Sequence, residues 1–591
     1  MMILRQHTNW MALLLLVIIV IFTSFYPAMG LKGYESNTII ISLSMLFLIS
    51  SFFSSNAQRI EGYPVSYINT LLVVFLIWSA FGYFYTVDQD TSLSSILLNI
   101  SGIILLVGLV LNIKKEEYLI QFLWVALFCA GLMGLIAILQ QFQIPSLLIP
   151  KINKMQMSTG LYGHKNALAT YLLLHFPLSI YFYFYSESNK KKYLAGVLSI
   201  FILLALIFSK SRGGQLVLII QIISILIYFS LKKDYSKILG LFVGLGLTTG
   251  LFLSIYSFTK IPLEPGVVGW EEHMYGSLIT GESNAWGNLK NRLTFWIIGW
   301  EIFKDYWFTG TGPWTFELLF PKYIADSMLS LYVGGDGNGS QSPPHSHNIF
   351  VQTATDSGII GLVFLLILLT SIYSRGLNLI QSAHPKIQNL AFFLTLSITG
   401  FMIHNQIEYN WIQINFIYPF IYLVFAVDFL DRKYKPRNNY DKKSSPLISS
   451  CIIVTFVLVG TLSTISYYKY QTIIYEKIIT GTSVGKMRTL TNKAKTYCSR
   501  CGWPHLEMAK NLIRQYRFNP DPAILVTAEI ELQEAKLLSQ FNPKRFIYLA
   551  EIRSFQKNWD EAKKLYVQAF THIKMKRFAL CRAFSVNPDK C

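Results

Sequence analysis

Long apolar segments separated by short polar ones recur along most of the 591-residue chain. Thirteen of these runs approach the length that an α-helix needs to cross a bilayer. The pattern predicts an all-α polytopic membrane protein with about 13 transmembrane helices. The runs cover approximately residues 11–26, 38–53, 67–84, 93–111, 119–140, 166–185, 194–208, 215–231, 238–258, 348–373, 388–404, 411–430 and 446–466.

The net charge of +19 would suit a nucleic-acid-binding protein, but the charge is not gathered in one patch. With the N-terminus placed in the cytoplasm, the seven inner connections hold 18 lysines and arginines, and the five short outer connections hold 6. This bias follows the positive-inside rule. We therefore expect membrane lipids and no nucleic acid as partners, and a C-terminus on the outer side.

Two long polar segments fall on the predicted outer side, and they divide the sequence into four parts. The parts are N-terminal transmembrane helices at 1–258, a large outer loop with an amphipathic helix at 259–347, C-terminal transmembrane helices at 348–468, and an outer helical domain at 469–591.

The last part reads as a small helical domain. Its segment "RFIYLAEIRSFQKNWDEAKKLYVQAF" predicts two amphipathic helices around a tight turn and resembles a tetratricopeptide (TPR)-like hairpin. The domain at 469–591 carries 22 lysines and arginines and 10 acidic residues, which fits either a solvated surface or contact with anionic headgroups. Cysteines gathered in an outer domain predict at least one disulfide, although "YCSRCGW" resembles half a zinc site; the four are Cys498, Cys501, Cys581 and Cys591.

Polar clusters at the outer ends of the apolar runs are the candidate chemistry, because burying such groups without a partner is costly. In "SKSRGGQL", Lys210 and Arg212 stand in a very short link, where they either snorkel to headgroups or bind an anion. Gly213 and Gly214 would let backbone N–H groups approach that anion. In "NLKNRLTFWIIGWEIFKDYWFTGTGPW" we expect an interfacial amphipathic helix with Arg292 at its start.

A third cluster is "PPHSHNIFVQTATDSGIIG", where His345, His347, Asn348 and Asp356 lead into an apolar run. From His347 the spacing is H-N-x9-G-x-x-G. The fourth cluster combines "GLYGHKNALATY", with His164, Lys165 and Asn166, and "HNQIEYNW", with His404 and Glu408. The alternative interpretation of each residue is a solvated polar side chain at a helix end that has no functional role.

The second and third motifs, together with "SKSRGG", resemble the O-antigen ligase and Wzy-type polymerase superfamily, which also includes bacterial protein O-oligosaccharyltransferases. The resemblance covers roughly residues 150–430. It implies a type C membrane glycosyltransferase in the bacterial inner membrane, with the C-terminal domain in the periplasm. The implied donor is a glycan on undecaprenyl diphosphate, and the implied transfer is inverting, metal-independent and free of cofactors.

Carried over residue by residue, the resemblance matches Arg212 and Arg292 to arginines that grip the donor diphosphate and His347 to an essential histidine. Fixed guanidinium groups would stabilise the leaving diphosphate, and an imidazole can remove the proton of the acceptor hydroxyl. The further substrate-binding candidates are Lys210, His345, Asn348, His164, Lys165, Asn166 and Asp356.

Three acceptors remain open: a lipid A core sugar for a ligase, another lipid-linked glycan repeat for a polymerase, or a protein for an oligosaccharyltransferase. The favoured interpretation is O-antigen ligase-like lipopolysaccharide biosynthesis. A polysaccharide or lipid transporter is the non-enzyme alternative, but it predicts charges at mid-membrane, where these apolar runs have almost none.

Overall fold

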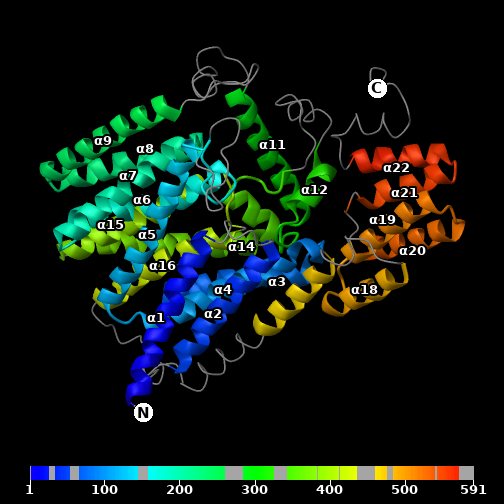
Figure 1. Cartoon of the computed structure of the whole chain (residues 1–591), viewed down its shortest axis with the longest axis horizontal. Helices are drawn as coiled ribbons and strands as arrows, with labels where there is room; N and C mark the ends of the chain where they lie inside the picture. The colour runs from blue at the N-terminus through cyan, green and yellow to red at the C-terminus, as the bar shows by residue number, and fades with distance from the viewer. Residues whose placement is uncertain are drawn as a thin grey trace. The chain divides into compact units, whose positions relative to one another are not determined.

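The computed structural model describes residues 2–25, 33–53, 66–143, 157–259, 284–324, 343–382, 384–411, 413–434, 460–474, 484–538, 542 and 544–571. In these ranges the regular elements are helices and none is a strand, and 10 helices are long and apolar enough to cross a membrane. The chain is therefore an all-α polytopic membrane protein, as the apolar pattern predicts (Figure 1).

Twelve of the 13 predicted runs coincide with helices. The remaining run, 446–466, lies mostly outside the described residues, which resume as a helix at 460–474. The chain divides into two compact units, and three of the five chain positions where one unit passes into the other fall inside long helices. These helices are α3 (Tyr67–Tyr85), α4 (Gln89–Asn112) and α14 (Ile349–Ile380).

The first unit contains residues Met1–Leu76, Ile100–Gly281 and Phe364–Gly460. Its centre is formed by α6 and α16, which are largely buried among their neighbours, whereas α9 is exposed along most of its length. Helix α6 packs against α5, α7, α8, α15 and α16. The helices that lie wholly in this unit are α1 (Met2–Phe25), α2 (Gly33–Phe53), α5 (Glu116–Gln141), α6 (Lys165–Tyr185), α7 (Asn189–Phe208), α8 (Arg212–Leu231), α9 (Tyr235–Thr259), α15 (Pro385–His404) and α16 (Ile414–Tyr434).

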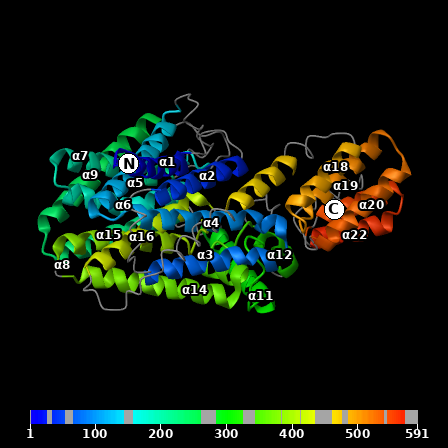
Figure 2. The same ribbon diagram turned by 90° about the horizontal axis from the view of Figure 1, so that it is seen from below.

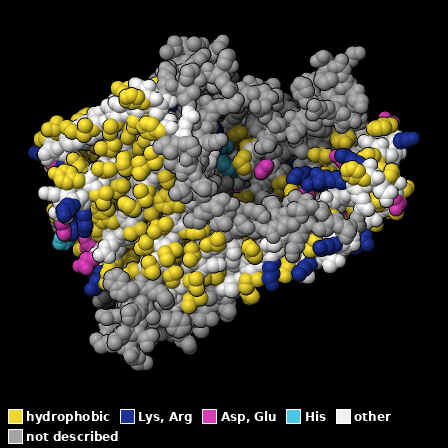
Figure 3. Space-filling view, viewed as in Figure 1, with side chains coloured by type: hydrophobic (Ala, Val, Ile, Leu, Met, Phe, Trp, Pro, Cys, Tyr) yellow, Lys and Arg dark blue, Asp and Glu magenta, His cyan; other side chains and the backbone are white. Residues whose placement is uncertain are grey.

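The surface of the first unit has the composition expected in contact with lipid. Exposed side chains of α8 and α9 are predominantly apolar and include Leu216, Ile219, Leu239, Phe242 and Leu247. In the space-filling view, hydrophobic side chains cover much of the face that carries α6 to α9 (Figure 3). Exposed apolar side chains on long helices are stable in hydrocarbon but not in water, so this face lies in the bilayer.

The second unit contains residues Ile77–Asn99, Glu282–Val363 and Thr461–Cys591. It joins the turn between α3 and α4, the segment Glu282–Val363 and the C-terminal segment. Asp90 at the start of α4 accepts a hydrogen bond from the backbone N–H of Trp503 at 2.8 Å and one from the hydroxyl of Tyr470. Its other helices are α11 (Asn284–Asp305), α12 (Phe316–Tyr323), α18 (Val484–Tyr497), α19 (Trp503–Phe518), α20 (Pro522–Leu538), α21 (Lys544–Phe555) and α22 (Trp559–Thr571).

Helices α18 to α22 form a compact bundle in both views (Figure 2). Its core includes Met508, Leu512, Leu532 and Ile552. The predicted disulfide is present between Cys498 and Cys501, which excludes a zinc site made by this pair, while Cys581 and Cys591 lie outside the described residues.

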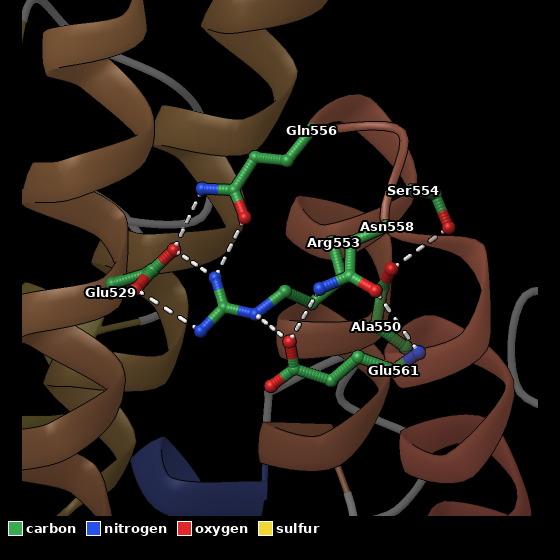
Figure 4. Close-up of polar contacts among 7 residues, drawn as sticks. All are labelled: Glu529, Ala550, Arg553, Ser554, Gln556, Asn558 and Glu561. Atoms are coloured by element: carbon green, nitrogen blue, oxygen red, sulfur yellow. Dashed lines mark hydrogen bonds and ion pairs between the residues drawn. The ribbon is translucent and has the colours of Figure 1, made fainter.

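Arg553 ties three helices of this bundle together. Its guanidinium contacts both carboxylate oxygens of Glu529 on α20, and its Nε lies 3.0 Å from a carboxylate oxygen of Glu561 on α22 (Figure 4). Gln556 contacts both Arg553 and Glu529. Helices α21 and α22 therefore form the hairpin that the sequence predicts, and their TPR-like character stays a prediction.

Candidate functional site

In the first unit, the start of α6, the start of α8 and the end of α15 meet in a hydrogen-bonded group that we call the α6–α8 cluster. The Asn166 amide donates to a Glu408 carboxylate oxygen at 2.6 Å and accepts from the Ser211 hydroxyl at 2.8 Å. The Thr170 hydroxyl contacts the Nδ1 atom of His404 at 2.9 Å and accepts from the Asn410 amide at 2.8 Å. The first polar cluster, which contains Ser211, and the fourth, which contains Asn166 and Glu408, are far apart in the sequence but form one site in the structure.

The link before α8 is shaped by an unusual backbone and a helix cap. Lys210 has a φ of 53° and is only 6% exposed. Ser211 is the N-cap of α8, and its hydroxyl oxygen accepts from the Gly214 N–H at 3.2 Å. Our expectation that Gly214 presents this N–H to an anion is therefore wrong, because the cap uses it.

The two glycines instead allow close packing. A Cβ on Gly213 would lie 2.3 Å from Cδ1 of Ile407, and a Cβ on Gly214 would lie 2.6 Å from Cβ of Ala169 on α6. Both distances are far below ordinary contact. Without side chains at these positions, the first turn of α8 can approach α6 and the end of α15 closely enough for the hydrogen bonds of the α6–α8 cluster.

Arg212 is the first residue of α8 and is half-buried. Within the described ranges its side chain makes no hydrogen bond or ion pair. The partial positive charge of a helix N-terminus makes this an unfavourable place for a cation. The site therefore concentrates positive charge and five N–H donors that no described residue uses, which is the arrangement that an anionic ligand requires.

The other candidates of this unit surround the same place. His164 is the exposed N-cap residue of α6 without a side-chain cap bond, and Lys165 is half-buried at the first helical position. Glu408 is 7% exposed and is held by Asn166. The roles of Thr170, Ser211 and Asn410 were missed from the sequence, because a serine, threonine or asparagine near a helix end has no distinctive pattern.

In the second unit, the histidine motif lies immediately before α14. The rings of His345 and His347 meet edge to face at 4.3 Å, and the ring of His347 stacks on Phe295 of α11 at 5.5 Å. His347 has a φ of 55°, so the chain turns sharply here. His345 is buried, and the side chain of His347 is half-buried.

Asn348 is the residue that starts the helix. Its amide oxygen accepts from the backbone N–H groups of Phe350 at 2.9 Å and Val351 at 3.2 Å, which is N-cap geometry. Helix α14 accordingly begins at Ile349. The sequence suggested that the histidines enter the helix, and the structure corrects this: the cap leaves both of them outside it.

Asp356 is buried with 5% exposure, and each of its carboxylate oxygens has a protein partner. One accepts from the Gln352 amide at 2.9 Å and the other from the Trp314 backbone N–H at 3.3 Å. Gln352 in turn accepts from the backbone N–H of Ser346 at 2.7 Å. Asp356 is therefore connected to the histidine turn through Gln352, and it anchors the loop that follows α11.

Gly358 interrupts α14 with a φ of 64° and a ψ of −165°. At this break the loop at 306–315 is hydrogen-bonded to the helix, through Ile359 N–H to the Trp307 carbonyl at 2.8 Å and Gly312 N–H to the Asp356 carbonyl at 3.0 Å. The neighbour that packs closely against Gly358 is therefore this loop, and the glycine is needed for its backbone angles as well.

Arg292 lies inside α11, which begins at Asn284, so our expectation that it stands at the helix start is wrong. It is three residues before Phe295 and seven before Gly299, and these positions share one face. That face contacts the histidine motif and α14, because Phe295 stacks on His347 and a Cβ on Gly299 would lie 2.3 Å from Val351. The predicted apolar stripe of α11 is exposed at Leu293, Ile297 and Trp300, as suits a bilayer interface.

Within each unit, the structure therefore gathers residues that the sequence singled out. The first holds Lys210, Arg212, His164, Lys165 and Asn166. The second holds Arg292, His345, His347, Asn348 and Asp356.

Comparison with known proteins agrees with these motifs. Residues 197–366 match the family model of the O-antigen ligase, a segment that includes both arginines and the histidine motif but not Asn166 or Glu408. Among curated proteins, none matches the chain. The match over residues 197–366 thus supports the resemblance of these motifs to the O-antigen ligase and Wzy-type superfamily.

Proposed function

We propose that this protein is a glycosyltransferase that transfers a glycan from undecaprenyl diphosphate to an acceptor at the periplasmic face of the bacterial inner membrane. O-antigen ligase-like transfer is the favoured form. The observation that carries the proposal is Arg212: within a segment that matches the O-antigen ligase model, its guanidinium stands at a helix N-terminus with no protein partner among the described residues.

In the proposed reaction an acceptor hydroxyl oxygen attacks the anomeric carbon of the donor glycan. The bond between that carbon and the diphosphate oxygen breaks, and the diphosphate leaves with the electron pair, so the configuration inverts. Arg212 and Arg292 bind the diphosphate and stabilise its growing charge more in the transition state than in the ground state. His347 takes the proton of the acceptor hydroxyl.

The remaining candidates are proposed to act around these three. Lys210, His164 and Lys165 contribute positive charge or hydrogen-bond donors beside Arg212, and Asn166 holds Glu408 toward the same cluster. His345 packs against His347 and fixes its ring. Asn348 and Asp356 are better described as positioning residues, since the first caps α14 and the second holds Gln352 and Trp314.

The orientation is also a proposal. The excess of lysine and arginine in the predicted inner connections favours a cytoplasmic N-terminus, and a disulfide between Cys498 and Cys501 is typical of a domain in an oxidising compartment. A reporter fused after residue 470 should then be active only in the periplasm, and one fused after Lys192 only in the cytoplasm. A cytoplasmic signal from the first fusion would remove the basis of the assignment.

Three acceptors remain candidates: a lipid A core sugar, a second lipid-linked glycan repeat as in a polymerase, and a protein serine or threonine. The basic C-terminal bundle offers a surface that could recruit any of them. Deletion of the gene distinguishes the three, because lipopolysaccharide, capsule or glycoprotein would lose its glycan. A transporter would change the location of the glycan lipid without transferring the glycan.

The direct test measures glycan transfer from a purified lipid-linked donor, with donor binding followed separately. Arg212→Lys and Arg292→Lys should each lose most activity, because lysine keeps the charge but cannot present the planar fork. Arg375→Lys is the matched control, since Arg375 is already paired with Asp431 at 3.0 Å. His347→Ala should lower the rate ~10²–10⁴-fold while donor binding survives. His345→Ala should cost less.

Three results would contradict the proposal. Full activity of the His347→Ala variant would exclude His347 as the base. Strict dependence on added magnesium, or loss of activity in EDTA, would exclude arginine-only stabilisation of the diphosphate. If Arg212→Lys and Arg375→Lys behaved alike, Arg212 would have no special role in the donor site.

A further inference from the structure

A polar cavity lies in the first unit, away from the α6–α8 cluster. Its volume is about 680 Å³, and five lysines line it: Lys114, Lys115, Lys191, Lys386 and Lys433. We call this cavity the lysine pocket. It adjoins the last residues of α6, Tyr181 to Tyr185, whereas the α6–α8 cluster adjoins the first, Lys165 and Asn166. A helix of 21 residues is about 30 Å long, so the two sites lie at opposite ends of the membrane-spanning α6.

The lysine pocket has more positive charge than its carboxylates neutralise. Glu116 is shared by Lys433 at 2.7 Å, the Tyr434 hydroxyl at 2.5 Å and Lys386 at 4.0 Å. Glu187 lies 3.6 Å from Lys386. Lys115 and Lys191 have no carboxylate partner in the described part of the chain, and the remaining acidic group of the lining is Glu117.

Helix ends increase this positive potential. The N-termini of α5, α7 and α15 all reach the lysine pocket, and Lys191 and Lys386 stand in the first turns of α7 and α15. A cation in the first turn of a helix opposes the helix dipole. An anion bound in the cavity would remove this repulsion and meet both the ammonium groups and the dipoles.

The wall of the lysine pocket is aromatic on the side that faces the membrane interior. The rings of Trp124 and Phe182 pack at 4.4 Å, about two turns below the charged rim of α5. On α7, Tyr193, Leu194 and Val197 follow Lys191 and are exposed, so an apolar surface continues from the rim along the helix. A charged head with an apolar chain would match both parts of this surface.

We propose that the lysine pocket binds the phosphate headgroup of an anionic membrane phospholipid, on the face of the membrane opposite the α6–α8 cluster. The ammonium groups of Lys115 and Lys191 bind the phosphate, and the acyl chains lie along the exposed apolar face of α7. All five lysines belong to connections that the charge bias assigns to the cytoplasmic side, so the bound lipid is in the inner leaflet. This inference does not depend on the glycosyltransferase proposal.

The test compares lipid retention by the purified full chain, measured by native mass spectrometry after equilibration with equimolar dioleoylphosphatidylglycerol and dioleoylphosphatidylcholine. The wild type should retain phosphatidylglycerol preferentially. The double variant Lys115→Gln/Lys191→Gln should lower this preference about 30-fold, at about fivefold for each lysine near a headgroup. Lys190→Gln/Lys192→Gln is the matched control, because it removes two lysines that do not line the pocket.

Competition with millimolar inorganic phosphate separates a lipid from a soluble phosphate. Phosphatidylglycerol that stays bound supports the proposal, and its complete displacement would show that the lysine pocket is a site for free phosphate. Equal retention of the two lipids by the wild type, or equal loss of preference in both double variants, would overturn the proposal. Both double variants should unfold thermally at the same temperature as the wild type, which reports that they are folded.

Discussion

Replacement of Gly358 by alanine should uncouple the loop at 306–315 from α14 and strongly lower activity without touching a proposed catalytic group. A Cβ at this position would lie 2.2 Å from the carbonyl oxygen of Phe308 and 2.7 Å from the backbone nitrogen of Gly310. The φ of 64° with a ψ of −165° is moreover a conformation that only glycine adopts readily. Neither obstacle is a flexible side chain, so the backbone itself must move.

The magnitude follows from what that movement breaks. The backbone strain is worth about 1–3 kcal/mol. Displacement of the loop by roughly 1 Å also weakens three hydrogen bonds, each worth about 1 kcal/mol. They join Thr311 N–H to the Thr355 carbonyl at 2.8 Å, Gly312 N–H to the Asp356 carbonyl at 3.0 Å and Ile359 N–H to the Trp307 carbonyl at 2.8 Å. The local loss therefore lies between about 1 kcal/mol for the strain alone and about 6 kcal/mol if all three hydrogen bonds are lost, and about 3 kcal/mol is near the middle of this range.

Amide hydrogen exchange across residues 306–315 is the assay, together with glycan transfer. A loss of about 3 kcal/mol corresponds to exchange accelerated ~100-fold, at tenfold for each ~1.4 kcal/mol. Activity should fall by a similar factor, because a misplacement of about 1 Å can cost ~10²-fold in rate. Gly244→Ala on α9 is the control, since no atom lies within 4 Å of its added Cβ. Unchanged exchange and activity in Gly358→Ala would refute the role of the break.

The other predictions concern the second unit. Arg553→Lys should destabilise the C-terminal bundle by about 1–2 kcal/mol, because lysine cannot bridge Glu529 and Glu561 together. Arg517→Lys is the control and should cost under about 0.5 kcal/mol, because Arg517 forms an exposed ion pair with Glu551. Equal amide exchange rates across α20 to α22 in the two variants would contradict this prediction. Desolvation by the surrounding protein raises the pKa of Glu317 above its ordinary value although its side chain is exposed, and Lys544 opposes this only in part, so stability falls slightly as pH rises through that range. Glu317→Gln should remove this pH dependence in thermal unfolding, and a variant that becomes less stable than the wild type at neutral pH would argue against it. Cys498 and Cys501 should resist alkylation in denatured, unreduced protein and react after reduction; labelling without reductant would exclude the disulfide.

The membrane helices could be predicted from the sequence because each is a continuous apolar run, and a bilayer leaves few alternatives to a spanning helix. Twelve of the thirteen runs coincide with helices. The ends were less predictable. Helix α11 begins at Asn284, ahead of the segment that its apolar stripe suggested, because the residues before the stripe carry no strong start or stop signal.

The candidate site was predictable as a set of residue types but not as a set of contacts. The sequence singled out Asn166 and Arg212 separately, and only tertiary structure connects them, through a hydrogen bond between Asn166 and the residue beside Arg212. Glycines were the hardest to interpret. From the sequence alone, Gly213 and Gly214 fit an anion-binding loop as well as a site of close packing. In the structure their lack of a side chain allows packing against Ile407 and Ala169.

The spacing of the H-N-x9-G-x-x-G motif acquires a physical reason from these contacts. Asn348 caps α14 and so fixes where the helix starts, which leaves His347 one residue outside it, with its ring against Phe295. Gly358 lies ten residues further on, nearly three turns into the helix, where the break lets the loop after α11 bond to the helix. That loop joins α11, which carries Phe295 and Arg292, to the same helix that holds His347 in place. A change of one residue in the spacing would rotate the break by about 100° relative to the cap and turn the loop away. The motif therefore fixes α11, which carries Arg292, relative to the turn that carries His347, through a cap at one end and a break at the other. In the proposed mechanism His347 is the one residue of the motif that takes part in the chemistry.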